Sequence, residues 1–166
     1  YHIKGYQNRG AWELNCGIKP ELILEMYQLY PYSDIVYVDA DAVFHQYPVF
    51  FYKCAGDISF YLHKGTELLS GTLFFKHTDR VKSLLTRWLM FQHQNPRVWD
   101  QKTLQHIVET YSKDLGLQIT SLPPEYIKIF DTMSNIQNPI IEHYQASRRF
   151  KHQVAAPSTM PRGIRI

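Results

Sequence analysis

The segment that most constrains the fold of this chain is the run of four apolar residues at positions 35–38. Three of the four are β-branched and the other is Tyr37, a composition typical of a strand that is covered on both faces. Pro31 and the pair Ser33–Asp34 precede the run and end the segment before it. The sequence therefore predicts an inner strand of a sheet, with Asp39 at its carboxyl end.

Helical and strand patterns alternate around this strand. Residues 20–30 begin with proline and have apolar side chains at helical spacing, which predicts an amphipathic helix packed on one face of the sheet. Segments 58–62 and 72–75 are predicted as strands. Two later helices are predicted from apolar residues that share a face: Val81, Leu84, Leu85 and Trp88 in the first, and Leu104, Ile107, Val108 and Tyr111 in the second. This alternation predicts an α/β fold with a mostly parallel central sheet flanked by helices.

The length and composition fit one globular domain. The chain has 166 residues, of which 45% are hydrophobic and 20% charged, so it is too apolar for general disorder. From about residue 117 the patterns weaken, with short strands predicted at 117–122 and 126–130. We predict one catalytic domain over residues 1–153 and an extended or flexible arm over residues 154–166.

Charge and apolar runs restrict the partners only in part. Residues 144–166 contain five basic residues and no acidic one, a pattern that suits phosphate, nucleic acid or an acidic membrane face, or a solvated tail. No apolar run reaches the roughly 18 residues of a membrane span. Cys16 and Cys54 could form at most one disulfide, so the compartment stays open between the cytoplasm and a membrane-associated lumenal location.

The tripeptide Asp39-Ala40-Asp41 carries the strongest chemical signal. Two carboxylates separated by one small residue, just past a buried strand, project into the crevice where open α/β sheets bind ligands. Such oxygen ligands suit Mg²⁺ or Mn²⁺, which bridge protein and phosphate oxygens. The alternative interpretation is that both are ordinary polar residues of a surface turn.

Four segments, in one order, resemble those of GT-A type glycosyltransferases. Residues 35–44, preceded by the helix that starts at Lys19-Pro20, resemble their DxD segment. Residues 69–74 resemble the small-residue strand that lines the donor sugar pocket, and residues 99–104 resemble the Asp-Gln motif at a helix start. Residues 141–148 take the place of the C-terminal segment whose His completes the metal site in glycosyltransferase family 8 and related families. The resemblance spans residues 19–151.

The resemblance implies a metal-dependent transfer reaction. Asp39, Asp41 and His143 would hold Mn²⁺ or Mg²⁺ against the diphosphate of a nucleoside diphosphate sugar, with their donor atoms within roughly 3 to 4.5 Å of one another. The sugar would pass to a hydroxyl group of an acceptor, which is a glycan, a protein or a small molecule. The resemblance favours retention of the configuration at the anomeric carbon. Only 38 residues precede Asp39. The nucleotide-binding part that precedes the DxD segment in these enzymes is therefore predicted to be short or missing here.

Roles for the donor-sugar residues follow from the same resemblance. Asp100 would hydrogen-bond sugar hydroxyls and Gln101 would present its amide oxygen near the anomeric carbon. Because Asp is also a favoured helix cap, Asp100 has a structural alternative. Ser70, Gly71 and Thr72 would let the backbone approach the sugar closely, or would form a simple turn or bulge.

Three cations are candidates for contact with the diphosphate. Lys19 is expected beside a helix N-terminus, which itself favours anions, and Arg148 and Lys151 compete with it for that role. Each is otherwise a solvated side chain. His143, one of eight histidines, would be an ordinary surface residue without the family pattern.

Two other functions fit part of the sequence. A phosphatase of the haloacid dehalogenase type would use Asp39 as its nucleophile and Asp41 as the general acid and base. It would leave residues 99–104 and His143 unexplained. A non-catalytic binding module would use the basic C-terminal segment, but its aromatic residues are not grouped with the basic ones, which does not favour nucleic acid.

Overall fold

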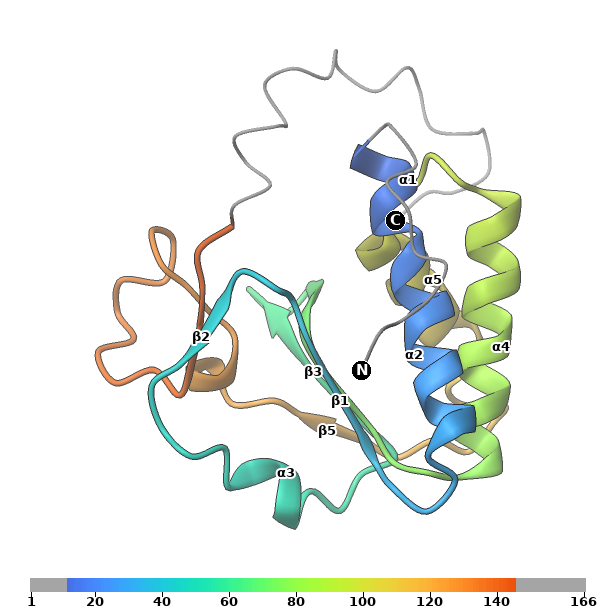
Figure 1. Ribbon diagram of the computed structural model, residues 1–166, viewed down its shortest axis with the longest axis horizontal. Coiled ribbons are helices and arrows are strands. Elements are labelled where there is room, and N and C mark those ends of the chain that lie inside the picture. Colours follow the sequence, from blue (N-terminus) through green and yellow to red (C-terminus); the bar gives the residue numbers. More distant parts are fainter. Residues whose placement is uncertain (1–11, 146–166) are drawn as a thin grey trace.

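The computed structural model of the protein describes residues 12–145 and contains two sheets and a layer of helices (Figure 1). The four-stranded sheet has the order β1 (Ile35–Val38), β4 (Glu67–Phe75), β3 (Ile58–His63) and β5 (Ile119–Ser121). The three-stranded sheet has the order β2 (Ala42–Phe44), β7 (Ile141–His143) and β6 (Lys128–Ile129). The predicted α/β class is confirmed.

Helices cover one face of the four-stranded sheet. These are α2 (Ile18–Leu29), α4 (Asp79–Gln94) and α5 (Asp100–Tyr111); in Figure 1, α2 and α4 lie side by side and α5 lies behind α2. Leu84, Leu85 and Trp88 of α4 are completely buried and belong to the core formed with α2, α5 and the four-stranded sheet. The apolar spacing in the sequence therefore predicted these helices correctly, and Pro20 is accommodated in the first turn of α2, where its missing N–H removes no bond.

Short elements complete the chain. Helix α1 (Trp12–Cys16) precedes α2, and α3 (Phe50–Lys53) follows β2. The segment 126–130, predicted as a strand, is instead divided between the 3-10 helix η1 (Pro124–Tyr126) and the two-residue strand β6. The prolines at 123 and 124 set backbone angles that suit a turn and interrupt the strand.

The prediction that residues 35–38 form an inner strand is wrong for the described part of the chain. Strand β1 lies at an edge, with antiparallel β4 as its one partner there, and Val36 is 40% exposed. Its apolar composition has a different cause, because Ile35 and Tyr37 pack against the helices while Val38 packs on the opposite side. An apolar run indicates that other residues pack on the strand. It does not indicate whether the strand has neighbours on both sides within the sheet.

The direction of the strands is mixed. Both β1 and β3 run antiparallel to β4, while β3 and β5 are parallel, so three of the four strands point the same way. Cys16 and Cys54 do not form a disulfide with each other. Among residues 12–145, none of the helices combines the length and apolar character that a membrane span requires. The predicted arm at 154–166 and its boundary lie outside the described residues.

Candidate active site

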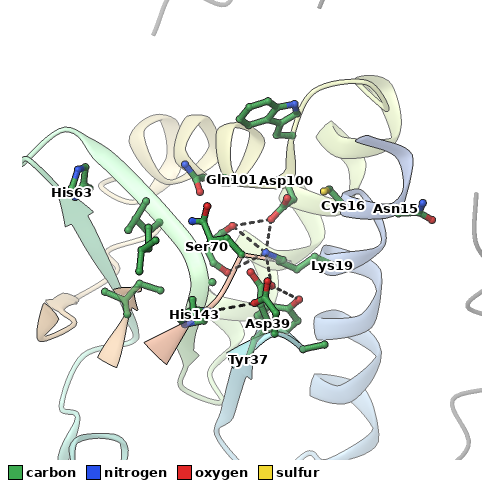
Figure 2. Close-up of a pocket in the computed structure, with 18 of the residues that line it drawn as sticks. Asn15, Cys16, Lys19, Tyr37, Asp39, His63, Ser70, Asp100, Gln101 and His143 are labelled. Atoms are coloured by element: carbon green, nitrogen blue, oxygen red, sulfur yellow. Dashed lines mark hydrogen bonds and ion pairs between the residues drawn. The ribbon is translucent and has the colours of Figure 1, made fainter. Parts of the chain in front are cut away.

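A pocket of about 700 Å³ lies where the two sheets meet the first turns of α2 and α5 (Figure 2). Its lining includes all the residues predicted from the DxD and Asp-Gln segments: Asp39, Asp41, Asp100 and Gln101. Lys19, Ser70, Gly71 and His143 also line it. Thr72 is completely buried and does not line the pocket, while Arg148 and Lys151 fall outside the described residues.

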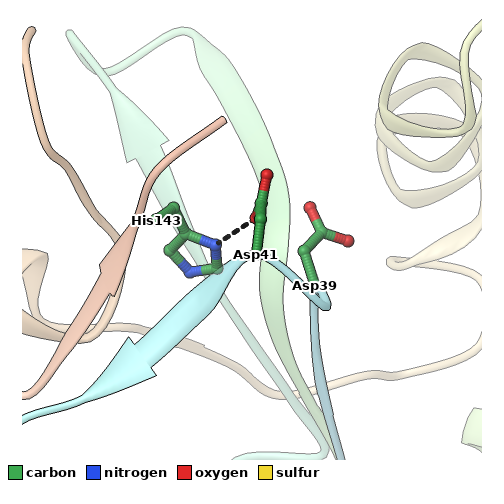
Figure 3. Close-up of side chains that lie close together, drawn as sticks. All are labelled: Asp39, Asp41 and His143. Carbon is green, nitrogen blue, oxygen red and sulfur yellow. Dashed lines mark ion pairs between the residues drawn. The ribbon is translucent and has the colours of Figure 1, made fainter. Parts of the chain in front are cut away.

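Three of these residues could hold a metal ion together. One ligand atom from each of Asp39, Asp41 and His143 lies within 4.8 Å of the other two, slightly beyond the separation expected from the sequence (Figure 3). Nδ1 of His143 lies 3.9 Å from Oδ1 of Asp41. The structure thus brings together two carboxylates and an imidazole that are about a hundred positions apart in the chain.

The pairing of β2 with β7 explains this convergence. Ala42, next to Asp41, lies opposite His143 in the antiparallel register, and the Tyr144 N–H donates to the carbonyl oxygen of Asp41. Asp39 stays with the other sheet, because its N–H donates to the carbonyl oxygen of Gly71 at 2.8 Å. The short turn at residues 39–42 therefore joins the two sheets and places one carboxylate on each side of the junction.

Lys19 is the centre of a polar cluster beside these ligands. Its amine lies 2.7 Å from Oδ2 of Asp100 and 3.1 Å from Oδ1 of Asp39, and donates to the Ser70 hydroxyl at 3.0 Å (Figure 2). Burial opposes the charged form, but the carboxylates of Asp100 and Asp39 outweigh it and raise the pKa of Lys19. Lys19 therefore carries its charge inside the pocket wall, bridging two acidic residues.

Tyr37 orients one of the acidic residues. Its hydroxyl donates to Oδ1 of Asp39 at 2.8 Å, the same oxygen that approaches the Lys19 amine. With Oδ1 engaged twice, Oδ2 of Asp39 is the oxygen left for a cation. The sequence analysis missed this role. The role could have been predicted from the alternation of side chains along a strand, which places residues 37 and 39 on the same face of the sheet.

Asp100 does not act as a helix cap. It is the first residue of α5, whose N-cap is Trp99, and its carboxylate faces Lys19 and accepts from the Ser70 hydroxyl at 2.9 Å. A buried chain of hydrogen bonds fixes this helix start: the Trp88 indole donates to Thr103, Thr103 donates to Gln92, and Gln92 donates to the carbonyl oxygen of Val98. Asp100 is thereby held with its charge toward the pocket.

Gln101 is oriented by a residue that the sequence analysis did not single out. Its amide nitrogen donates to Oε1 of Glu67 at 2.9 Å, and both side chains line the pocket. This bond uses one of the two amide hydrogens and leaves the amide oxygen as an acceptor for a ligand. Glu67 starts β4 and gave no motif signal of its own, since a single acidic residue after a turn is common.

Comparison with known proteins agrees with this geometry. The family model described as nucleotide-diphospho-sugar transferase matches residues 16–146, which is most of the chain and includes every described residue of the site. The chain belongs to this family. It is a glycosyltransferase, and the predicted resemblance to GT-A type nucleotide-sugar enzymes is confirmed at that level, while family 8 in particular stays a prediction.

A solved structure supports the fold of this glycosyltransferase. The chain is similar to the crystal structure of a glycosyltransferase involved in the glycosylation of the major capsid of PBCV-1, with a TM-score of 0.67 and 12% identity, over 92% of this chain and 81% of that one. No match was found among curated proteins. The family assignment does not favour the phosphatase or the binding module as alternatives.

Proposed function

We propose that this glycosyltransferase moves a sugar from a nucleoside diphosphate sugar to an acceptor hydroxyl with the help of Mn²⁺ or Mg²⁺. The observation that supports the metal most directly is the convergence of Asp39, Asp41 and His143, whose ligand atoms lie within 4.8 Å of one another. A set of two carboxylate oxygens and one imidazole nitrogen suits Mn²⁺ well and also accepts Mg²⁺.

The geometry fits one small cation after a modest adjustment. Ligand atoms about 2.1 Å from a shared ion lie at most about 4.2 Å apart. Small side-chain rotations that move these atoms by a few tenths of an ångström would bring all three within reach of one ion. Burial lowers the pKa of His143, an effect that the nearby carboxylates of Asp39 and Asp41 oppose. A neutral imidazole has the lone pair that coordination needs. When bound, the cation would offset the negative charge that builds on the departing diphosphate.

The other pocket residues suit the rest of the donor. Lys19 adds a buried positive charge beside the proposed metal site, which favours an anionic diphosphate. Asp100 and Ser70 offer an acceptor and a hydroxyl for sugar hydroxyls, and Gln101 offers its amide oxygen on the same side of the pocket. We propose retention of configuration because the Asp-Gln and His arrangement resembles families that are mostly retaining.

The decisive variant is Asp41→Asn, which removes one ligand charge without changing the shape of the side chain. Hydrolysis of a panel of nucleoside diphosphate sugars is measured as Mn²⁺ or Mg²⁺ is titrated, with the anomeric configuration of the released sugar read by NMR. We expect the variant to lose more turnover than the roughly 10- to 100-fold that loss of an outer contact to a metal ligand costs. The melting temperature of the metal-free protein should not fall, because repulsion between the carboxylates is relieved.

Asp114→Asn is the matched control. Asp114 is exposed and does not line the pocket, so this variant should keep wild-type turnover and metal dependence. The proposed role of the cation would be contradicted if Asp41→Asn kept full metal-dependent turnover. It would also be contradicted if wild-type turnover did not change when metal or chelator was added. An inverted product would remove the proposal of retention and leave the cation untouched.

A further inference from the structure

The buried hydroxyl of Thr72 contacts the imidazole ring of His143. Thr72 lies on β4 opposite Val38, is completely buried, and its Oγ1 is 2.8 Å from Nε2 of His143, which is itself only 3% exposed. Because Thr72 does not line the pocket, it is not placed to touch a sugar. Its position calls for a different role from the one expected from the sequence.

The two nitrogens of the His143 ring face different groups. Nε2 faces the Thr72 hydroxyl, whereas Nδ1 faces the Asp41 carboxylate at 3.9 Å. A ring nitrogen coordinates a cation through its lone pair, so coordination by Nδ1 requires the proton to be on Nε2. The Thr72 hydroxyl can accept a hydrogen bond from a protonated Nε2, which holds that side of the ring and leaves the lone pair of Nδ1 for a cation.

Gly71 gives the same ring the space that it occupies. A Cβ at position 71 would lie 3.0 Å from Cε1 and 3.2 Å from Nδ1 of His143, closer than ordinary carbon contacts. Cδ1 of Ile127 lies 3.2 Å from the same point, so a side chain at position 71 would be crowded by Ile127 as well. The missing side chain at position 71 therefore serves the histidine, beside the carbonyl group that fixes the backbone of Asp39.

We propose that Thr72 and Gly71 are positioning residues for the metal site: Thr72 anchors the His143 ring through Nε2 and accepts the Nε2 proton when Nδ1 coordinates the cation, and Gly71 allows the ring to face Asp41. This inference rests on the proposed function, since it assigns a purpose to the orientation of a proposed ligand. It also reassigns Gly71 and Thr72 of β4 from contact with the donor sugar to support of the third metal ligand, whereas Ser70 keeps its proposed contact with the sugar.

The test compares Mn²⁺ affinity, measured by titration calorimetry, across three variants of the full chain. Thr72→Val keeps the shape and removes the hydroxyl, and we expect it to bind Mn²⁺ about 10- to 100-fold more weakly. Thr72→Ser restores a hydroxyl and should bind within a few-fold of wild type. Gly71→Ala should also weaken binding, and it keeps the proposal testable if Thr72→Val does not fold.

Thr120→Val on β5 is the matched control, because it removes a hydroxyl from the same sheet away from the pocket and should leave Mn²⁺ affinity unchanged. A second readout is the ¹⁵N spectrum of the Mg²⁺-loaded protein, in which the His143 signals are identified by their loss in His143→Gln. The wild type should show a protonated Nε2.

Each failure has its own meaning. Wild-type Mn²⁺ affinity in Thr72→Val, equal weakening in Thr72→Ser, or a proton on Nδ1 would overturn the role of Thr72 while the metal site stands. Unchanged affinity in Gly71→Ala would overturn the role of Gly71. No Mn²⁺ binding by the wild type would overturn the proposed metal site and both positioning roles with it.

Discussion

The four-stranded sheet and the three-stranded sheet of this glycosyltransferase are stabilised by different interactions. Among the described residues, 15 buried apolar side chains join the larger sheet to its helices, whereas five form the cluster that supports the smaller one. The smaller sheet has strands of two or three residues and depends more on polar contacts. Glu142 on β7 lies 2.9 Å from both Lys128 and His45, and Tyr144 donates to it as well.

The site draws on both regions. Lys19 and Asp100 lie on α2 and α5, and Asp39 follows β1, so these three belong to the larger body, which is the four-stranded sheet with its helices. Asp41 and His143 are tied to the smaller sheet through the β2–β7 pairing. The larger body therefore supplies the residues proposed to bind the sugar donor, and the smaller sheet supplies two of the three proposed metal ligands. Changes in the two regions should accordingly affect stability and metal binding in different proportions.

Leu84→Ala is expected to have the largest effect on stability. Leu84 is completely buried in α4, and truncation of such a side chain costs roughly 2–5 kcal/mol, from lost transfer free energy and from the cavity left behind. The measurement is urea denaturation of the metal-free protein. Mn²⁺ affinity, measured where the variant is folded, should change little because Leu84 does not line the pocket.

Met90→Ala on the same helix is the control for this prediction. Met90 is 58% exposed, so its truncation should change stability by no more than about 0.5 kcal/mol. If both variants were equally destabilised, the larger body would not be held by its apolar core, and the contrast between the two regions would disappear.

The contrast between the regions also explains how much the sequence could predict. Helices α4 and α5 follow from apolar spacing, since Leu84 and Ile107 must face a core for the chain to fold. The smaller sheet has no such period: β7 is three residues long, and its partner β2 lies about a hundred positions away. His143 was identified as a candidate ligand through the resemblance alone, because periodicity carries no signal over so few residues.

The contacts that orient the candidate ligands could not be predicted from the sequence. Thr72 and Tyr37 were assigned to other roles or to none, because their partners are set by the register of β4 against β1 and by the depth of the pocket. Lys19 was expected to contact the diphosphate, and its bridge between Asp39 and Asp100 depends on how α2 packs. Such contacts require coordinates, since spacing along the chain does not encode them.

Lys19→Met is expected to have an intermediate effect, because it removes the cation between two acidic side chains and keeps most of the apolar stem. Breaking a fully buried pair costs about 3–5 kcal/mol. Asp39 is 37% exposed and faces a pocket that admits water, so we expect a smaller loss of about 2 kcal/mol. Urea denaturation measures it, and adding Asp100→Asn should recover part of the loss, because one unpaired charge is then gone.

Lys82→Met serves as the control for Lys19→Met, since Lys82 is exposed on α4 and its loss should be nearly neutral. A Lys19→Met variant as stable as this control would mean that the polar cluster contributes nothing to the larger body. Strict additivity of Lys19→Met and Asp100→Asn would mean that the 2.7 Å pair does not couple energetically.

Glu142→Gln should have the smallest effect and should reveal the polar character of the smaller sheet through its pH dependence. The hydrogen bond from Lys128, with those from His45 and Tyr144, lowers the pKa of Glu142 below its usual value, although burial opposes the shift. A carboxylate whose pKa is lowered on folding stabilises the protein above its unfolded pKa of about 4.3, and loses that contribution as pH falls through the folded value. The melting temperature of the wild type should therefore exceed that of Glu142→Gln at pH 5.5, and the difference should shrink toward pH 3. The exposed Asp114→Asn control should show no comparable trend. A difference that is constant with pH would mean that the ionised form of Glu142 is not what holds β6 and β7 together.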